Sequence, residues 1–130
     1  TTGTAKFKGK IVGTVLTNNS IRSLTGGNEL QVDFGSGLID IKIGTVIREG
    51  GGQTGGTTFL PYKDFTGAGV ISDTTFSGTI SEVNGNATGE FEGTFFGPVA
   101  NEAGGTFEFE NGSGYASGAF TSQQTETAGQ

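Results

Sequence analysis

The chain has 130 residues, of which 26 are glycine and 11 are phenylalanine, and its formal net charge is −6. This length suits one domain with a single core, and the large apolar residues exclude a disordered linker. The sequence contains no His, Cys, Met or Trp, which excludes disulfides, thiolate metal sites and Ser–His catalytic pairs. The acidic charge argues against nucleic acid, heparin or an anionic membrane as the partner.

Apolar and polar residues alternate along most of the chain, which is typical of half-buried β-strands. The alternation predicts eight strands, at residues 6–16, 30–34, 38–47, 64–72, 74–82, 87–97, 104–110 and 114–121. Turn residues separate several of these strands: Gly35-Ser36-Gly37, Asp73, Asn84-Gly85 and Asn111-Gly112. The pattern fits an all-β fold, either a curved sandwich or an eight-stranded up-and-down antiparallel β-barrel, and we favour the barrel because closure removes both sheet edges.

A recurring unit places a large inward side chain, one outward residue and then an inward glycine, as in Phe7-Lys8-Gly9 and Phe91-Glu92-Gly93. A small eight-stranded barrel leaves just enough interior space for side chains, so rings that alternate with glycines can interdigitate. The pattern predicts a core filled by side chains. We expect the barrel to span residues 1–122, with a flexible tail at residues 123–130.

Catalytic and cofactor signatures are missing from the sequence. Glu90 with Glu92, and Glu108 with Glu110, are carboxylate pairs at strand spacing, so they should face solvent rather than form a glycosidase dyad. Haem would have only Tyr62 and Tyr115 as axial ligands. We therefore expect no enzyme activity and no cofactor, and a haem or small-ligand carrier remains an alternative.

Charge is divided along the chain. Residues 1–63 contain seven basic and four acidic groups, whereas residues 64–130 contain nine acidic groups and no basic group. The division can be due to chance and solubility alone. Alternatively, it creates a surface with one basic and one acidic region that orients a protein partner.

The segment "GEFEGTFFGPVANEAGGTFEF", followed by "GYASGAF", resembles the C-terminal signature of the transferrin-binding protein B β-barrel family. The matching positions are Gly93, Phe95, Phe96, Gly97, Pro98, Ala100, Glu102, Gly104, Gly105 and Phe107, and then Gly118, Ala119 and Phe120. The matched residues read as parts of the barrel structure, so they identify the family without identifying a binding site.

The resemblance implies a surface-exposed, outer-membrane-anchored or secreted protein of a Gram-negative bacterium, whose barrel usually accompanies a handle domain. Members of the family bind transferrin, haemoglobin or haem, complement regulators, or heparin, and many use an outer-membrane translocator. This sequence includes neither a handle domain nor a cysteine for lipidation, and its acidic charge disfavours heparin. We therefore predict a non-enzymatic module that binds a host iron- or haem-carrier protein. A structural or export-recognition barrel is a further alternative.

The binding end can be predicted from the connections. The two longest, from Thr17 to Asn28 and from Arg48 to Lys63, are the first and third, so they should share one rim, opposite both termini and the "GPVANE" turn. These connections mix Arg with aromatic and aliphatic residues, a composition typical of protein interfaces. The candidate binding residues are Arg22, Leu24, Arg48, Phe59, Leu60 and Tyr62. The alternative is that Phe59 and Leu60 plug the barrel mouth and that Arg22 and Arg48 are only solvated.

Overall fold

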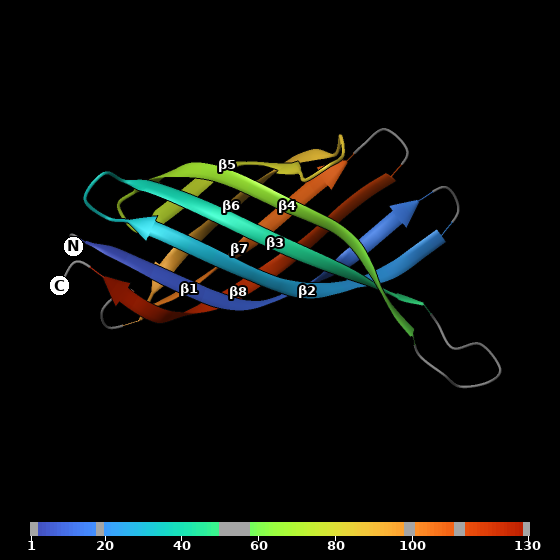
Figure 1. Cartoon of the computed structure of the whole chain (residues 1–130), viewed down its shortest axis with the longest axis horizontal. Helices are drawn as coiled ribbons and strands as arrows, with labels where there is room; N and C mark the ends of the chain where they lie inside the picture. Colours follow the sequence, from blue (N-terminus) through green and yellow to red (C-terminus); the bar gives the residue numbers. More distant parts are fainter. Residues whose placement is uncertain (1–2, 18–19, 50–57, 98–100, 111–113, 129–130) are drawn as a thin grey trace.

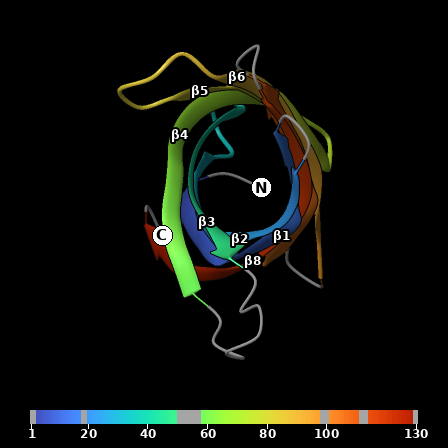
Figure 2. The same ribbon diagram turned by 90° about the vertical axis from the view of Figure 1, so that its right-hand side faces the viewer.

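A computed structural model describes residues 3–17, 20–49, 58–97, 101–110 and 114–128. The described chain forms eight antiparallel strands that close into one barrel in sequence order, as predicted (Figure 1). The strands are β1 (Thr4–Thr17), β2 (Ser20–Asp33), β3 (Leu38–Glu49), β4 (Thr58–Ser72), β5 (Thr75–Glu82), β6 (Thr88–Phe96), β7 (Glu102–Glu110) and β8 (Gly114–Ala128). Figure 2, which looks at the barrel from one end, shows the strands as a closed ring.

Inward side chains from every strand fill the barrel interior, which confirms the predicted core. Phenylalanines are prominent among the fully buried side chains: Phe7, Phe65, Phe91 and Phe120. Rings from different strands contact one another, with centroids 4.2 Å apart for Phe65 and Phe109. Aromatic pairs at this spacing stabilise a core beyond the area that they bury.

Glycines make room for these rings. Gly93 on β6 lies opposite Gly105 on β7, and a Cβ atom at Gly93 would lie 2.5 Å from Cζ of Phe76 on β5. A Cβ at Gly118 on β8 would similarly lie 2.8 Å from Cζ of Phe107. Phenylalanine rings therefore occupy the space above inward glycines, as the recurring Phe-x-Gly unit predicts.

The two ends of the barrel differ. Thr4 pairs with Ala128, so β1 begins and β8 ends at one end, here named the terminal rim (Figure 1). The connections at residues 34–37 and 73–74 are also at the terminal rim, where β6 ends and β7 begins. At the opposite end, here named the distal rim, β1, β3, β5 and β7 end and the strands that follow them begin. The predicted division of the connections between two rims is thus confirmed, and the predicted turns at Gly37, Asp73 and Asn84 have positive φ angles of 75°, 58° and 62°.

Three expected boundaries differ from the observed ones. Strand β2 begins at Ser20, so the stretch between Thr17 and Asn28, which we expected to be a long connection, is almost entirely strand. Strand β4 begins at Thr58, five residues before the expected end of the third connection at Lys63, while residues 50–57 lie outside the described chain. Strand β8 pairs with β1 as far as Ala128, beyond the expected barrel boundary at residue 122. The expected turn at Asn111-Gly112 lies outside the described residues.

A β-bulge interrupts the pairing of β3 with β4. Gly44 pairs with Asp64 and Val46 pairs with Pro61, so Thr45 alone lies opposite two residues, Tyr62 and Lys63. The Thr45 hydroxyl donates to the Lys63 carbonyl at 2.6 Å and accepts from the Lys63 N–H at 2.8 Å. Bulges re-aim the side chains that follow them. This bulge lets Tyr62 and Lys63, which are neighbours in sequence, both reach partners on the inward face.

Candidate functional site

The six predicted binding residues lie together at the distal ends of three adjacent strands. Arg22 and Leu24 are in β2, Arg48 is in β3, and Phe59, Leu60 and Tyr62 are in β4. In register, Arg48 lies opposite Ser23 and Phe59, and Ile47 lies opposite Leu24 and Leu60. The expectation that these residues occupy loops is therefore wrong, because strand pairing extends almost to the rim. For Arg48, Phe59 and Leu60 the structure describes only the strand position.

Leu24 has to be removed from the set of exposed candidates. Its side chain is 2% exposed and belongs to the core, where it lies opposite Gly13. Arg22 lies opposite the buried Val15, on the inward-facing register of β2, and it is partly exposed at the barrel mouth. Tyr62 is partly buried, with its ring centroid 6.4 Å from that of Phe109. Arg22 and Tyr62 thus line the mouth rather than project from a loop.

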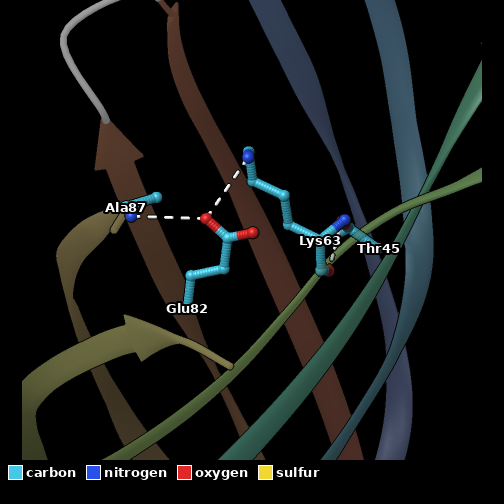
Figure 3. A network of polar contacts seen from close by, with 4 residues as sticks. All are labelled: Thr45, Lys63, Glu82 and Ala87. Carbon is cyan, nitrogen blue, oxygen red and sulfur yellow. Dashed lines mark hydrogen bonds and ion pairs between the residues drawn. The ribbon is translucent and has the colours of Figure 1, made fainter. Parts of the chain in front are cut away.

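A polar network occupies the same mouth (Figure 3). The Lys63 ammonium lies 3.3 Å from Oε1 of Glu82, and 5.1 Å from the centre of the Tyr62 ring. The side chains of Lys63 and Glu82 are only 17% and 14% exposed. Glu82 lies opposite the buried Phe65, so its carboxylate faces the barrel interior. Charged side chains at such low exposure need partners, and each supplies one to the other.

Glu82 also holds the connection between β5 and β6. The same Oε1 atom accepts a hydrogen bond from the Ala87 N–H at 3.3 Å, and the Glu82 N–H donates to the Ala87 carbonyl at 2.8 Å (Figure 3). A Cβ atom at Gly85 would lie 2.1 Å from the Glu82 carboxyl carbon. Residues 83–87 therefore fold over the Glu82 side chain, and the mouth is built around a fixed carboxylate.

The mouth has the chemistry of a recognition surface. It combines the cations of Arg22 and Lys63, the anion of Glu82 and the amphipathic ring of Tyr62. Of these residue types, Arg and Tyr are enriched at protein interfaces. Among the described residues there is no cluster of three or more acidic, histidine or cysteine side chains that could hold a metal ion. The described part of the chain also contains no helix long and apolar enough to cross a membrane.

Sequence reasoning missed a row of exposed apolar side chains next to the mouth. Ile21 on β2, Leu16 on β1 and Tyr115 on β8 lie opposite one another in register. They are 74%, 47% and 43% exposed, and we name them the outer apolar row. The signal that could have revealed the row is the pair Val15-Leu16, in which two adjacent apolar residues of one strand must face opposite sides.

Residues 1–124 match the family described as the C-lobe and N-lobe beta barrels of Tf-binding protein B. A comparison with curated proteins finds no match.

Solved structures of similar barrels come from several bacteria. A variant of transferrin-binding protein B from Haemophilus parasuis superposes with a TM-score of 0.70 at 21% identity, covering 99% of this chain and 27% of that one. Transferrin-binding protein B from serogroup B Neisseria meningitidis gives 0.64 at 24% identity, covering 97% and 26%. The N-lobe domain of lactoferrin-binding protein B from Moraxella bovis gives 0.60 at 14% identity, covering 95% and 60%.

This chain spans about a quarter of the length of the two transferrin-binding proteins. The family match over residues 1–124 includes the signature around Gly97-Pro98, and the solved structures of the family have the same barrel fold. The chain therefore belongs to the family of C-lobe and N-lobe β-barrels of transferrin-binding protein B.

Proposed function

We propose that this barrel is a non-enzymatic binding module of a surface-exposed or secreted protein of a Gram-negative bacterium. The observation that carries the proposal is membership of the family over residues 1–124. The named relatives are bacterial proteins that bind transferrin or lactoferrin. By extension, the partner of this chain is a host protein of the iron- or haem-carrier type, and an outer-membrane translocator is a second partner during export.

The distal rim is the proposed binding end. It groups Arg22, Tyr62 and Lys63 at the barrel mouth, with Arg48 in the adjacent strand, whereas both chain ends lie at the terminal rim. A tether at either terminus would present the distal rim away from the cell surface. Arg and Tyr are among the residues that carry the most binding energy in protein interfaces, because they combine large contact areas with specific polar groups.

The filled interior favours a protein partner over a buried small ligand. Phe7, Phe65, Phe91 and Phe120 lie in the barrel interior, and each is almost completely buried. An apolar ligand would have to displace these rings. A surface partner requires no such change.

Binding of immobilised chain to iron-loaded transferrin, lactoferrin and haemoglobin tests the proposal. We expect one of them to bind, and we expect Arg22→Ser with Arg48→Ser to weaken that binding about ten-fold or more. The matched control is Lys8→Ser with Lys42→Ser, which removes two exposed cations from the outer wall and should leave the affinity unchanged.

Two results would overturn the proposal. Failure of all three carriers to bind a folded chain would exclude the partner class. Unchanged affinity of the folded Arg22 and Arg48 variant, together with loss of binding on changing Glu102 at the start of β7, would move the site to the terminal rim.

A further inference from the structure

The outer wall beside the distal rim breaks the usual pattern of an antiparallel barrel. Outward positions of such sheets are normally polar, because they face water. The outer apolar row instead places Ile21, Leu16 and Tyr115 side by side on β2, β1 and β8. Val12 lies four residues from Leu16 on the same outward face of β1 and is 64% exposed. Side chains that are apolar, exposed and adjacent in register mark a candidate contact surface.

The row continues directly into acidic side chains. Tyr115 lies opposite Glu110 on β7, and its hydroxyl donates a hydrogen bond to Oε2 of Glu108 at 2.8 Å. One step along the strands, Glu108 lies opposite Glu90 on β6, and Glu92 follows on the same outward face. All four glutamates are exposed, and we name them the acidic face: Glu90, Glu92, Glu108 and Glu110.

The acidic face is energetically unfavourable in the isolated barrel. Like charges placed directly opposite each other in a sheet destabilise the pairing, and Glu90 and Glu108 are such a pair. The chain has no basic residue after Lys63, so β5 to β8 contain no cation that could compensate them. Lys63 itself is engaged with Glu82 inside the mouth. A positively charged partner would relieve this repulsion.

The wall is also hollowed along the acidic face, around Glu90, Glu92 and Glu108, and the hollow reaches Val12 on β1. An open depression of about 920 Å³ runs across the outward faces of β8, β7 and β6, between β1 and β5. Small residues make up much of its lining, because Thr, Ser, Ala and Gly occupy most of the positions beside the glutamates. It is lined by Val12, Gly13, Thr14, Ser77, Gly78, Thr79, Glu90, Phe91, Glu92, Thr106, Phe107, Glu108, Ser117, Gly118 and Ala119. Long side chains of a partner can enter this depression.

We propose that the outer apolar row and the acidic face together form a docking surface for a basic protein segment. Aliphatic or aromatic side chains of that segment cover Leu16 and Ile21, while its Lys or Arg side chains enter the depression and pair with Glu90 and Glu108. The acidic charge excludes nucleic acid and anionic lipid as occupants, and the apolar row excludes a purely ionic contact. This surface is on the outer wall, separate from the mouth residues of the proposed function, and its occupant is independent of the carrier bound there.

A pair of synthetic peptides tests the docking surface. The basic peptide alternates lysine with leucine and threonine, and its acidic twin has glutamate in place of every lysine. Isotope-labelled chain is titrated with each peptide, and the backbone amide resonances are followed by NMR. We expect the basic peptide to shift the amides of Leu16, Ile21, Tyr115 and Glu108, and added salt to weaken the binding. The acidic twin should produce no shifts.

Two variants distinguish binding at this surface from nonspecific binding to exposed apolar residues. Leu16→Ser combined with Glu90→Gln should weaken binding of the basic peptide about ten-fold or more. Leu38→Ser with Val70→Ser is the matched control, because these residues form another exposed apolar pair in register, at the terminal rim, and are 55% and 58% exposed. The control should bind as the unmodified chain does.

Three outcomes would overturn the proposal. They are shifts confined to Leu38 and Val70 or to the mouth, equal binding of the acidic twin, and absence of any shift with the basic peptide. None of them depends on whether transferrin, lactoferrin or haemoglobin binds the distal rim, so the two proposals can fail separately.

Discussion

Asn28 on β2 donates a side-chain hydrogen bond to the main-chain carbonyl of Thr121 on β8, at 3.2 Å, although 93 residues separate the two in sequence. The same amide nitrogen donates to the Lys10 carbonyl on β1, also at 3.2 Å. Gly9 on β1 lies opposite Asn28 on one side and opposite Ser122 of β8 on the other. A Cβ atom at Gly9 would lie 1.7 Å from the Thr121 oxygen, so only glycine leaves room here. One buried amide thus links three strands where the first and last close the barrel.

Replacing Asn28 with alanine should destabilise this closure. The change removes both donated hydrogen bonds at a side chain that is only 6% exposed, and we expect a loss of about 1–3 kcal/mol in the free energy of unfolding. Chemical denaturation measures it. Ser122→Ala is the control, since Ser122 is also buried near Gly9 but its hydroxyl has no partner among the described protein atoms. Equal losses in the two variants would show that the amide bonds contribute nothing specific.

Gly93→Ala should destabilise the barrel by overpacking. The new methyl group would lie 2.4 Å from the Gly104 carbonyl oxygen and 2.5 Å from Cζ of Phe76, so the ring and the strand must move. We expect a loss of about 1–3 kcal/mol. Gly44→Ala is the control, because its nearest neighbour would be a side-chain oxygen of Asp64 at 3.5 Å, an ordinary contact. A Gly93 variant as stable as the Gly44 variant would mean that the interior is loosely packed.

The fold could be predicted from sequence because most strands alternate without interruption. Large inward residues such as Phe65 and Ile80 are fully buried where the period-two pattern places them. The pattern fails in β2 between Ser20 and Asn28, where the inward positions include Arg22 and Asn28 and the outward Ile21 is apolar. Alternation predicts a loop for this segment, because its inward polar side chains form hydrogen bonds with other strands only in the closed barrel.

The mouth could be predicted only in part. A bulge cannot be located from alternation alone, since one extra residue in β4 reverses which side chains face inward. That reversal brings Tyr62 and Lys63 to the interior and places Lys63 beside Glu82, a pairing between strands that neither residue signals by itself. The resemblance around Gly97-Pro98 identified the family, and it carried no information about these contacts.

Glu82→Ala should loosen the distal rim. Lys63 and the Ala87 N–H would both lose their acceptor at a partly buried position, and we expect a loss of about 1–3 kcal/mol in the free energy of unfolding. Amide hydrogen exchange should accelerate across residues 83–87, because their main anchor is gone. Glu82→Gln keeps an acceptor and should have a smaller effect, while Glu92→Ala on the exposed wall should change little. Unaltered exchange in the Glu82→Ala variant would contradict the anchoring role.

Tyr115 gives the outer wall a measurable pH dependence. Its hydrogen bond to Glu108, reinforced by the negative charge of that carboxylate, raises the pKa of Tyr115 above its ordinary value of about 10. Only the protonated phenol can donate this bond. The contribution to stability is therefore complete below about pH 10, and it is lost as the pH rises through the raised pKa, since the unfolded chain releases the proton first.

Ultraviolet absorbance of tyrosinate measures the titration, and Tyr115→Phe identifies which part of the signal belongs to this residue. Glu108→Ala removes both the acceptor and the charge, so we expect the Tyr115 transition to move to lower pH. Glu110→Ala removes a nearby exposed charge that acts on the phenol without a hydrogen bond, and it should move the transition less. An unchanged midpoint in the Glu108 variant would mean that the two side chains are not bonded in solution. In that case Glu108 would be as available to a basic partner as Glu90 is.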